Sequence, residues 1–274
     1  MKITGFYFAW ACEDWVLKSI ANKLKICDEI FVSVQAHTPQ MALLADKTES
    51  LVANLGDKRV HMVPQIPLSG NIDVTKCKIL NSMLELVCTG DTIMLCDSDE
   101  FYDDNAIKEI KEETAKDDWD MIRVHDRFFC INMNWYLGGS HGRFWKVKQG
   151  SKFYPTQNIL PEPLNVKLIL EDNPMFHYSM LMPLEYRKAF WESEQKWHMV
   201  EWLDKIYTKW NLDAISSEMK ELASENYRIT GHDGFWFNGG VDELDMPPYL
   251  HRFEGSHPEE IEFSTLRNKK DYRI

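Results

Sequence analysis

The chain has 274 residues, and a hydrophobic content of 44% with ten tryptophans is enough for a large folded domain with a substantial core. Its 43 acidic residues outnumber 31 basic ones and give a formal net charge of −12. Such a chain is unsuited to sequence-independent binding of nucleic acid or of an anionic membrane surface, so we expect neither as a partner.

The six cysteines are scattered, mostly inside apolar runs, and form no Cys-x-x-Cys pair or other spacing typical of a zinc site. We therefore expect reduced, buried thiols and a reducing compartment. The first residues enter a strand directly, without the apolar segment of a signal peptide, and no apolar stretch approaches the roughly 20 residues of a membrane span. These features predict a soluble, cytoplasmic protein without a membrane span.

The first 118 residues alternate between predicted strands and helices. Strands are predicted over residues 2–10, 29–35, 59–63 and 92–96, and helices over residues 13–24, 39–55, 73–87 and from residue 106. Alternation with short connections predicts an α/β fold, in which a parallel sheet carries helices on both faces. Ligands of such sheets bind beyond the carboxyl ends of the strands.

From Trp119 the pattern becomes mixed or antiparallel and rich in loops. Strands are predicted over residues 120–130, 143–147, 152–154, 166–170 and 175–178, with turns at Gly138-Gly139 and His141-Gly142, and helices over residues 184–197, 200–210 and 214–223. The predicted organisation is one domain over residues 1–182, in halves 1–118 and 119–182. A helical and irregular extension, residues 183–274, is expected to pack on it.

The stretch Asp91–Tyr102 carries the strongest chemical signal. The buried strand over residues 92–96 stops abruptly at Asp97-Ser98-Asp99-Glu100, where three carboxylates within four residues repel one another unless a cation holds them. Oxygen ligands of this type suit Mg²⁺ or Mn²⁺. The alternative is a cluster that caps the following helix, and the position at the end of a buried strand favours the metal.

Two other segments should meet these acids at the same edge of the sheet. Trp10–Glu13 follows the first predicted strand, and Gln35–His37 follows the second. The chain has no Gly-x-Gly-x-x-Gly after its first strand, no Gly-x-x-x-x-Gly-Lys-Ser/Thr loop and no Gly-x-Ser-x-Gly elbow. Any phosphate chemistry at this edge is therefore expected to run through a metal.

Three segments resemble family 2-type glycosyltransferases of the GT-A fold: Phe8–Trp15, Asp28–Val32 and Asp97–Phe101. The resemblance covers roughly the first 180 residues. It departs where the family has Asn-Glu-Glu, which is Ala11-Cys12-Glu13-Asp14 here, and where Val34-Gln35-Ala36 takes the place of a nucleotide-binding Asp. The resemblance implies a GT-A-like, Rossmann-type mixed sheet flanked by helices. Its first half would bind a nucleotide sugar, and its second half would face the acceptor.

The implied activity is that of a metal-dependent, hexosyltransferase-like glycosyltransferase. It would move a sugar from a nucleoside-diphosphate sugar to a hydroxyl of a glycan or glycoconjugate, with inversion. Mn²⁺ or Mg²⁺ would stabilise the charge on the leaving nucleoside diphosphate, with Asp99 as a direct ligand and Asp97 facing the ribose or the metal. The donor-binding set by this resemblance is Ala9, Trp10, Glu13, Gln35, Lys76, Asp97 and Ser98.

Two further residues complete the donor side of the resemblance. Similar enzymes often place a histidine near the metal and diphosphate, which would be His177 here, and an imidazole ligand favours Mn²⁺ over Mg²⁺. The alternative for His177 is a core histidine that donates to a backbone carbonyl. Lys76 would reach the donor phosphate, and its alternative is an exposed helix lysine.

An inverting transferase needs a carboxylate that deprotonates the acceptor hydroxyl. Glu162 resembles the family position, and the flanking Pro161 and Pro163 would fix its backbone. The same prolines suit a plain surface turn, and Glu171-Asp172 is a competing acidic pair. Trp236 is the candidate on the acceptor side.

Two other functions compete with this interpretation. A sugar nucleotidyltransferase usually carries a basic, glycine-rich loop after the first strand, whereas Trp10–Glu13 contains no Gly, Lys or Arg. A non-catalytic protein that binds carbohydrate or a metal such as Ca²⁺ could use the same acids.

Overall fold

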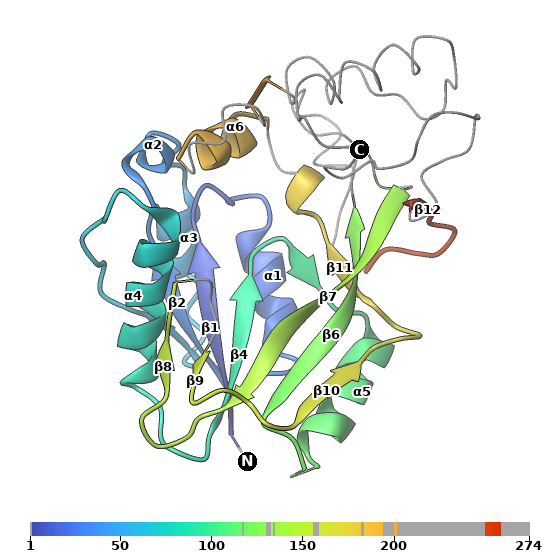
Figure 1. Ribbon diagram of the computed structural model, residues 1–274. Helices are drawn as coiled ribbons and strands as arrows, with labels where there is room; N and C mark the ends of the chain where they lie inside the picture. Colours follow the sequence, from blue (N-terminus) through green and yellow to red (C-terminus); the bar gives the residue numbers. More distant parts are fainter. Residues whose placement is uncertain are drawn as a thin grey trace.

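A mixed β-sheet with helices on both faces forms the body of the protein (Figure 1). The computed structural model describes residues 2–116, 118–129, 133, 135–155, 159–181, 184–193, 200–201 and 250–258. This is the α/β architecture that the alternation of elements predicts, and the mixed sheet is the one that the resemblance to GT-A glycosyltransferases implies.

The amino-terminal half of the sheet is parallel. Its strands, in spatial order, are β3 (Val60–Met62), β2 (Glu29–Val34), β1 (Ile3–Ala9) and β4 (Thr92–Asp97). The helices between them are α1 (Val16–Lys23), α2 (Pro39–Ala42), α3 (Thr48–Ala53) and α4 (Ile72–Leu84). The strand–helix alternation predicted for this half is confirmed.

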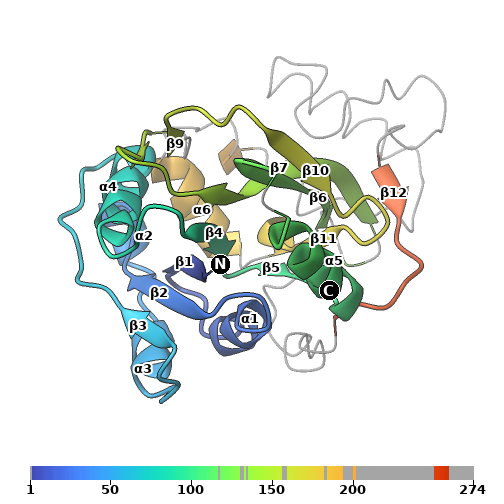
Figure 2. The ribbon, with the colours of Figure 1, turned by 90° about the horizontal axis from the view of Figure 1, so that it is seen from below.

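Alternate side chains of β1 face opposite layers of helices. Phe6 and Phe8 pack in one core cluster with apolar residues of α4. Tyr7 and Ala9 belong to a second cluster, with residues of α1 and of α5 (Asp104–Thr114). Because successive strand residues point to opposite faces, an almost continuous apolar strand needs cover on both sides. Seen from below, α4 and α1 lie on either side of β1 (Figure 2).

The second half of the sheet is mixed, as predicted. It comprises β5 (Glu100–Phe101), β6 (Met121–Phe129), β7 (Trp135–Lys146), β10 (Val166–Ile169), β11 (Met175–His177) and β12 (Leu250–Arg252). β7 joins the halves by antiparallel pairing with both β4 and β6. β11 runs parallel to β6 and antiparallel to β5, so it returns to the segment that follows β4. A separate ribbon is formed by β8 (Lys152–Phe153) and β9 (Ile159–Leu160).

The single helix predicted over residues 39–55 is two short helices, α2 and α3. Asp46 lies in the break, where its Oδ1 accepts a hydrogen bond from the backbone N–H of Thr48 at 2.8 Å. Its Oδ2 accepts from the backbone N–H of Glu13 at 2.9 Å. An aspartate that bonds nearby backbone N–H groups competes with helix continuation, which explains why the apolar pattern was misleading here.

The turns predicted at Gly138-Gly139 and His141-Gly142 are also wrong, because all four residues lie inside β7. At Gly139 a Cβ atom would stand 2.7 Å from Oδ1 of Asp126 on β6. At Gly142 a Cβ would stand 2.5 Å from the Met121 side chain. These glycines therefore allow side chains of neighbouring strands to pack closely, which is another common role of glycine within a strand.

Several predictions fall beyond the described residues. The helix predicted over residues 184–197 appears as α6 (Leu184–Ser193), and residues 179–181 form a short 3₁₀ helix, Ser179–Leu181. The helices predicted over residues 200–210 and 214–223, and Trp236, lie outside the part of the chain that the structure describes.

The five cysteines that the structure describes have free thiols. No helix in the described ranges has the length and apolarity needed to cross a bilayer.

A buried asparagine anchors the chain after β5 to α1. The Asn22 amide nitrogen donates to the carbonyl of Tyr102 at 2.8 Å, and the Tyr102 N–H donates to the Asn22 carbonyl oxygen at 2.9 Å. The neighbouring Lys23, also buried, donates from Nζ to the carbonyl of Glu100. Burial lowers the pKa of Lys23. Side chains of α1 thus hold the backbone that follows the acids.

Asn22→Ala is expected to lower the free energy of unfolding by about 2–4 kcal/mol, because two backbone groups of Tyr102 would lose their partner inside the core. Asn54→Ala is the matched control, since the Asn54 amide bonds the Ser50 carbonyl at 2.7 Å in an exposed position. The free energy of unfolding of Asn54→Ala should fall by less than about 1 kcal/mol. Urea unfolding of both variants checks this, and equal losses would contradict the anchoring role.

The segment that carries β12 returns to the sheet through His257. His257 Nδ1 lies 2.8 Å from the Tyr178 hydroxyl, and Nε2 lies 3.1 Å from the Met133 carbonyl oxygen. Because a carbonyl only accepts, Nε2 carries the proton and Nδ1 accepts from Tyr178. Burial lowers the pKa of His257 from 6.5 to about 4, although the Met133 hydrogen bond opposes the shift. His257 is therefore neutral in the folded protein at pH 7.

This lowered pKa predicts stability that is lost in acid. Above pH 6.5 the ring is neutral in both states and its contribution is complete, whereas between about pH 6.5 and 4 only the unfolded chain takes up the proton. The stability advantage of the natural protein over His257→Gln should therefore shrink by about 1–2 kcal/mol on acidification, a value reduced for partial exposure. Denaturant unfolding at pH 7 and pH 4 measures it, and a constant difference would contradict the assignment.

Candidate functional site

A cavity of about 270 Å³ opens at the carboxyl ends of β1 and β4. Its wall is built from the residues after these strands, from α4, from the end of β11 and from the aromatic face of α6. Figure 1 shows α6 at this end of the sheet. The position agrees with the sequence prediction that ligands bind beyond the carboxyl ends of the parallel strands.

The acidic stretch divides between this cavity and the core. Asp97, Ser98 and Asp99 line the cavity, and the Asp99 carbonyl accepts from the Tyr178 N–H at 2.9 Å, which ties the turn to the end of β11. Glu100 is fully buried and pairs with Arg143 of β7 through Nε–Oε2 at 3.0 Å and a second contact from Nη2 to Oε1. Glu100 therefore braces the turn from behind.

Arg143 also favours the ionised form of Asp97. Its Nη2 lies 3.7 Å from Oδ2 of Asp97. Burial alone would raise the pKa of Asp97, but Lys76 and Arg143 outweigh it and lower that pKa. Asp97 is therefore ionised at neutral pH.

Asp99 behaves differently from Asp97. Burial raises the pKa of Asp99 to about 6, and the nearby Asp97 and Glu100 carboxylates add to the increase, while His177 opposes it. Burial and the neighbouring carboxylates thus disfavour the charged form of Asp99. A bound cation would favour it.

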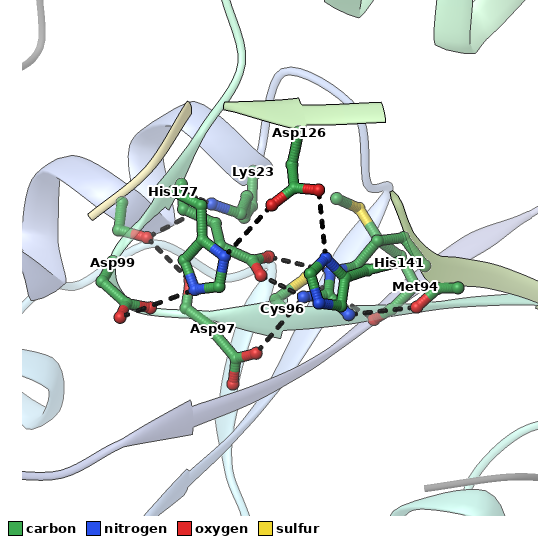
Figure 3. A network of polar contacts seen from close by, with 12 residues as sticks. Lys23, Met94, Cys96, Asp97, Asp99, Asp126, His141 and His177 are labelled. Atoms are coloured by element: carbon green, nitrogen blue, oxygen red, sulfur yellow. Dashed lines mark hydrogen bonds and ion pairs between the residues drawn. The ribbon is translucent and has the colours of Figure 1, made fainter. Parts of the chain in front are cut away.

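His177 stands between two carboxylates (Figure 3). Its Nε2 lies 4.0 Å from Oδ2 of Asp99, and its Nδ1 lies 3.6 Å from Oδ2 of Asp126. Burial on its own would lower the pKa of His177, but the interactions with Asp126 and Asp99 raise it to about 9. Both ring nitrogens thus face carboxylates, which differs from a core histidine that donates to a backbone carbonyl.

The residues on this wall have the chemistry of ligands for a divalent cation. Asp97 and Asp99 offer carboxylate oxygens, and His177 offers an imidazole nitrogen, all from residues that line one cavity. This donor set suits Mn²⁺, and its carboxylates also suit Mg²⁺. The three predicted metal ligands line the same cavity, and their role as ligands stays a prediction.

Besides Asp97, three members of the predicted donor-binding set line the cavity: Trp10, Lys76 and Ser98. The Trp10 indole N–H donates to the Met41 carbonyl at 2.7 Å, which fixes the ring at the rim. The Lys76 ammonium lies 5.5 Å from the centroid of the Phe8 ring. Lys76 therefore places a positive charge on the wall of the acidic cavity.

Other members of the set do not line the cavity. Ala9 is buried in the core at the end of β1. The Glu13 carboxylate accepts from the Lys47 N–H at 3.2 Å, in the loop before α3. The Gln35 amide bonds both backbone groups of Ile66, at 2.7 and 3.1 Å. Gln35 holds the chain after β3, so the departure from the family's Asp is matched by a structural role.

The structure does not bring Glu162 together with the acids. Glu162 is exposed, in the turn after β9. Two residues later, the Leu164 N–H donates at 2.8 Å to Asp120, just before β6. Figure 1 shows β9 and the start of β10 at the end of the sheet opposite α6. The proline-flanked segment is a surface turn, and the exposed pair Glu171-Asp172 does not line the cavity either.

Some lining residues were not predicted. His37 is 6% exposed, and burial together with Lys76 lowers its pKa to about 3, so it stays neutral. Its segment was predicted to reach this edge, but no role was assigned to it. Tyr186, Phe190 and Trp191 come from α6, whose place over the cavity depends on long-range packing that the sequence pattern does not show.

No family model matches the chain, and no curated protein sequence matches it. Among solved structures, residues 1–349 of S. aureus TarS share 12% identity at a TM-score of 0.45, over 88% of this chain and 74% of that one. The same protein in complex with UDP-GlcNAc gives 12% identity and a TM-score of 0.48, over 84% and 72%.

A third solved structure, 4-diphosphocytidyl-2C-methyl-D-erythritol synthase, is 12% identical at a TM-score of 0.35, over 53% of this chain and 75% of that one. At such scores these likenesses carry no argument about activity. The function is therefore proposed from the residues of the cavity.

Proposed function

We propose that the protein is a metal-dependent glycosyltransferase that moves a sugar from a nucleoside-diphosphate sugar to an acceptor hydroxyl. The observation that carries this proposal is the convergence of Asp97, Asp99 and His177 on one cavity wall, with Lys76 lining the same cavity. An acidic site handles an anionic diphosphate only with added positive charge, and a divalent cation with a lysine provides it.

Five of the lining residues would hold the donor. Asp99 and His177 would hold Mn²⁺ or Mg²⁺, with Asp97 beside them. When bound, the metal supplies Lewis-acid stabilisation of the charge that develops on the departing diphosphate. Lys76 attracts the phosphate oxygens. His37, neutral and buried at the cavity, adds a hydrogen-bonding group without adding charge.

The acceptor side is proposed to recognise a carbohydrate. Trp10, Phe190 and Trp191 line the cavity, and flat aromatic faces pack well against the C–H surfaces of sugars. Inversion, which the family resemblance implies, requires a carboxylate that takes the acceptor proton. Among the described lining residues the carboxylates are Asp97 and Asp99, both on the donor side. The base must therefore reach the cavity from another segment.

A thermal-shift panel of UDP, GDP, TDP and CMP, each with and without Mn²⁺, tests this function. We expect one nucleoside diphosphate to raise the melting temperature only when Mn²⁺ is present. At a hundredfold excess over its dissociation constant, the stabilisation should be about 2.7 kcal/mol. If no nucleotide gives a metal-dependent shift, the glycosyltransferase proposal fails.

A further inference from the structure

Asp126 and His141 take no part in the proposed chemistry, although they form a cluster with His177. Asp126 of β6 lies between His141 of β7 and His177 of β11, as Figure 3 shows. Its Oδ1 is 3.3 Å from His141 Nδ1, and its Oδ2 is 3.6 Å from His177 Nδ1. Asp126 is 2% exposed, whereas the His141 side chain is 45% exposed.

The two histidines compensate the buried carboxylate of Asp126. Burying a carboxylate is costly unless positive or hydrogen-bonding groups compensate it. His141 and His177 are the groups that face this carboxylate, one at each oxygen. Gly139, the cross-strand partner of Asp126, leaves room for the carboxylate, since a Cβ there would stand 2.7 Å from Oδ1.

The orientation of the His177 ring connects this cluster to the cavity. Its Nδ1 edge faces Asp126, and its Nε2 edge faces Asp99 and the cavity. A neutral imidazole has one proton, and the nitrogen without it is the one that can ligate a metal. Histidine ligands commonly donate their other ring N–H to a carboxylate, which fixes both the tautomer and the ring orientation.

We propose that Asp126 is a positioning residue: its carboxylate faces the Nδ1–H of His177, so that Nε2 is the ring nitrogen that gives up its proton and ligates a metal beside Asp99. His141 braces the second carboxylate oxygen. This inference rests on the proposed function, and it assigns a role to an acid that does not line the cavity.

The same three residues also have the spacing of metal ligands, since their ligand atoms all lie within 4.8 Å of one another. A metal on Nδ1 would leave the proton on Nε2 and remove His177 as a ligand on the cavity side. It would also sit against the Asp126 carboxylate, which is buried and does not line the cavity. The positioning role keeps Nε2 available to the cavity, and the experiment below separates the two arrangements.

The first test compares Asp126→Ala with Asp126→Asn by the Mn²⁺ and Mg²⁺ concentrations that half-saturate UDP-dependent stabilisation. We expect Asp126→Ala to raise the Mn²⁺ requirement about 10- to 100-fold. The Mg²⁺ requirement should rise much less, because Mg²⁺ prefers oxygen ligands and depends less on His177. Asp126→Asn should restore much of the Mn²⁺ affinity, since an amide oxygen still accepts from Nδ1–H. His125→Ala, at the preceding position of β6, is the matched control.

A parallel rise in both metal requirements, or no rescue by asparagine, would show a merely structural role and overturn the proposal. The second test records the ¹⁵N shifts of labelled histidines in the Zn²⁺-loaded protein, with His177→Gln for assignment. We expect Nε2 to be ligated and Nδ1 protonated. Ligation through Nδ1, or no ligated nitrogen on His177, would overturn it. Failure of the proposed function appears separately, as a natural protein with no Mn²⁺-dependent nucleotide shift.

Discussion

Asp99→Asn is expected to reduce metal-dependent cleavage of the nucleoside-diphosphate sugar by about 10²- to 10³-fold. Asp99 lines the cavity and faces Nε2 of His177, and burial raises its pKa to about 6 although His177 opposes the shift. An amide of the same size keeps the shape of the turn but removes the charge that would hold the cation. Donor hydrolysis without acceptor, followed over a Mn²⁺ titration, measures the loss.

Asp104→Asn is the control for this experiment. Its side chain is 90% exposed, five positions further along the chain, where it lies 3.3 Å from Lys25. The same chemical change there should leave activity within about twofold of the natural protein, because exposed ion pairs contribute little. Retention of full metal-dependent activity in Asp99→Asn would remove Asp99 from the metal site.

The second large effect concerns stability. Glu100→Gln and Arg143→Met should each lower the free energy of unfolding by about 3–5 kcal/mol, because each leaves the other charge buried without its partner. Glu100 is fully buried, and Arg143 is 6% exposed. Their two-point contact joins the turn after β4 to β7. Denaturant unfolding of both single variants measures the loss.

The double variant and a surface pair complete this experiment. The double variant, Glu100→Gln with Arg143→Met, should be less destabilised than either single variant, because neither charge of the pair remains in the core. The recovery should be partial, because Asp97 still loses its contact with Arg143. Glu112→Gln disrupts an exposed pair with Lys108 at 4.0 Å on α5 and should cost no more than about 0.5 kcal/mol. Single core variants that lose no more than this control would contradict the bracing role of the pair.

Several residues that line the cavity could be predicted from sequence because their signals are local. The apolar run that ends at Asp97 marks the end of a buried strand, and strand–helix alternation predicts which strand ends share an edge. The predictions for Lys76, at the start of its helix, and for His177, at the end of its strand, use the same reasoning together with the family resemblance. All of these residues line one cavity.

The misplaced predictions depended on contacts between distant segments. Glu162 is predicted from its resemblance to a family position and from its flanking prolines, and neither feature shows at which end of the sheet the turn lies. The glycines of β7 were interpreted as turns, although Gly139 accommodates Asp126 from another strand. Asp126 and His141 meet His177 only through the pairing of three strands. A single acid in an alternating strand gives little sign of such a cluster.

The most direct test of the central claim is a crystal structure with Mn²⁺ and the nucleoside diphosphate that the thermal-shift panel selects. Anomalous scattering locates the ion without prior assumptions. We expect one Mn²⁺ in the cavity, bound by Asp99 and Nε2 of His177 and in contact with the diphosphate. A nucleotide bound elsewhere, or an ion that Asp99 does not touch, would contradict the account.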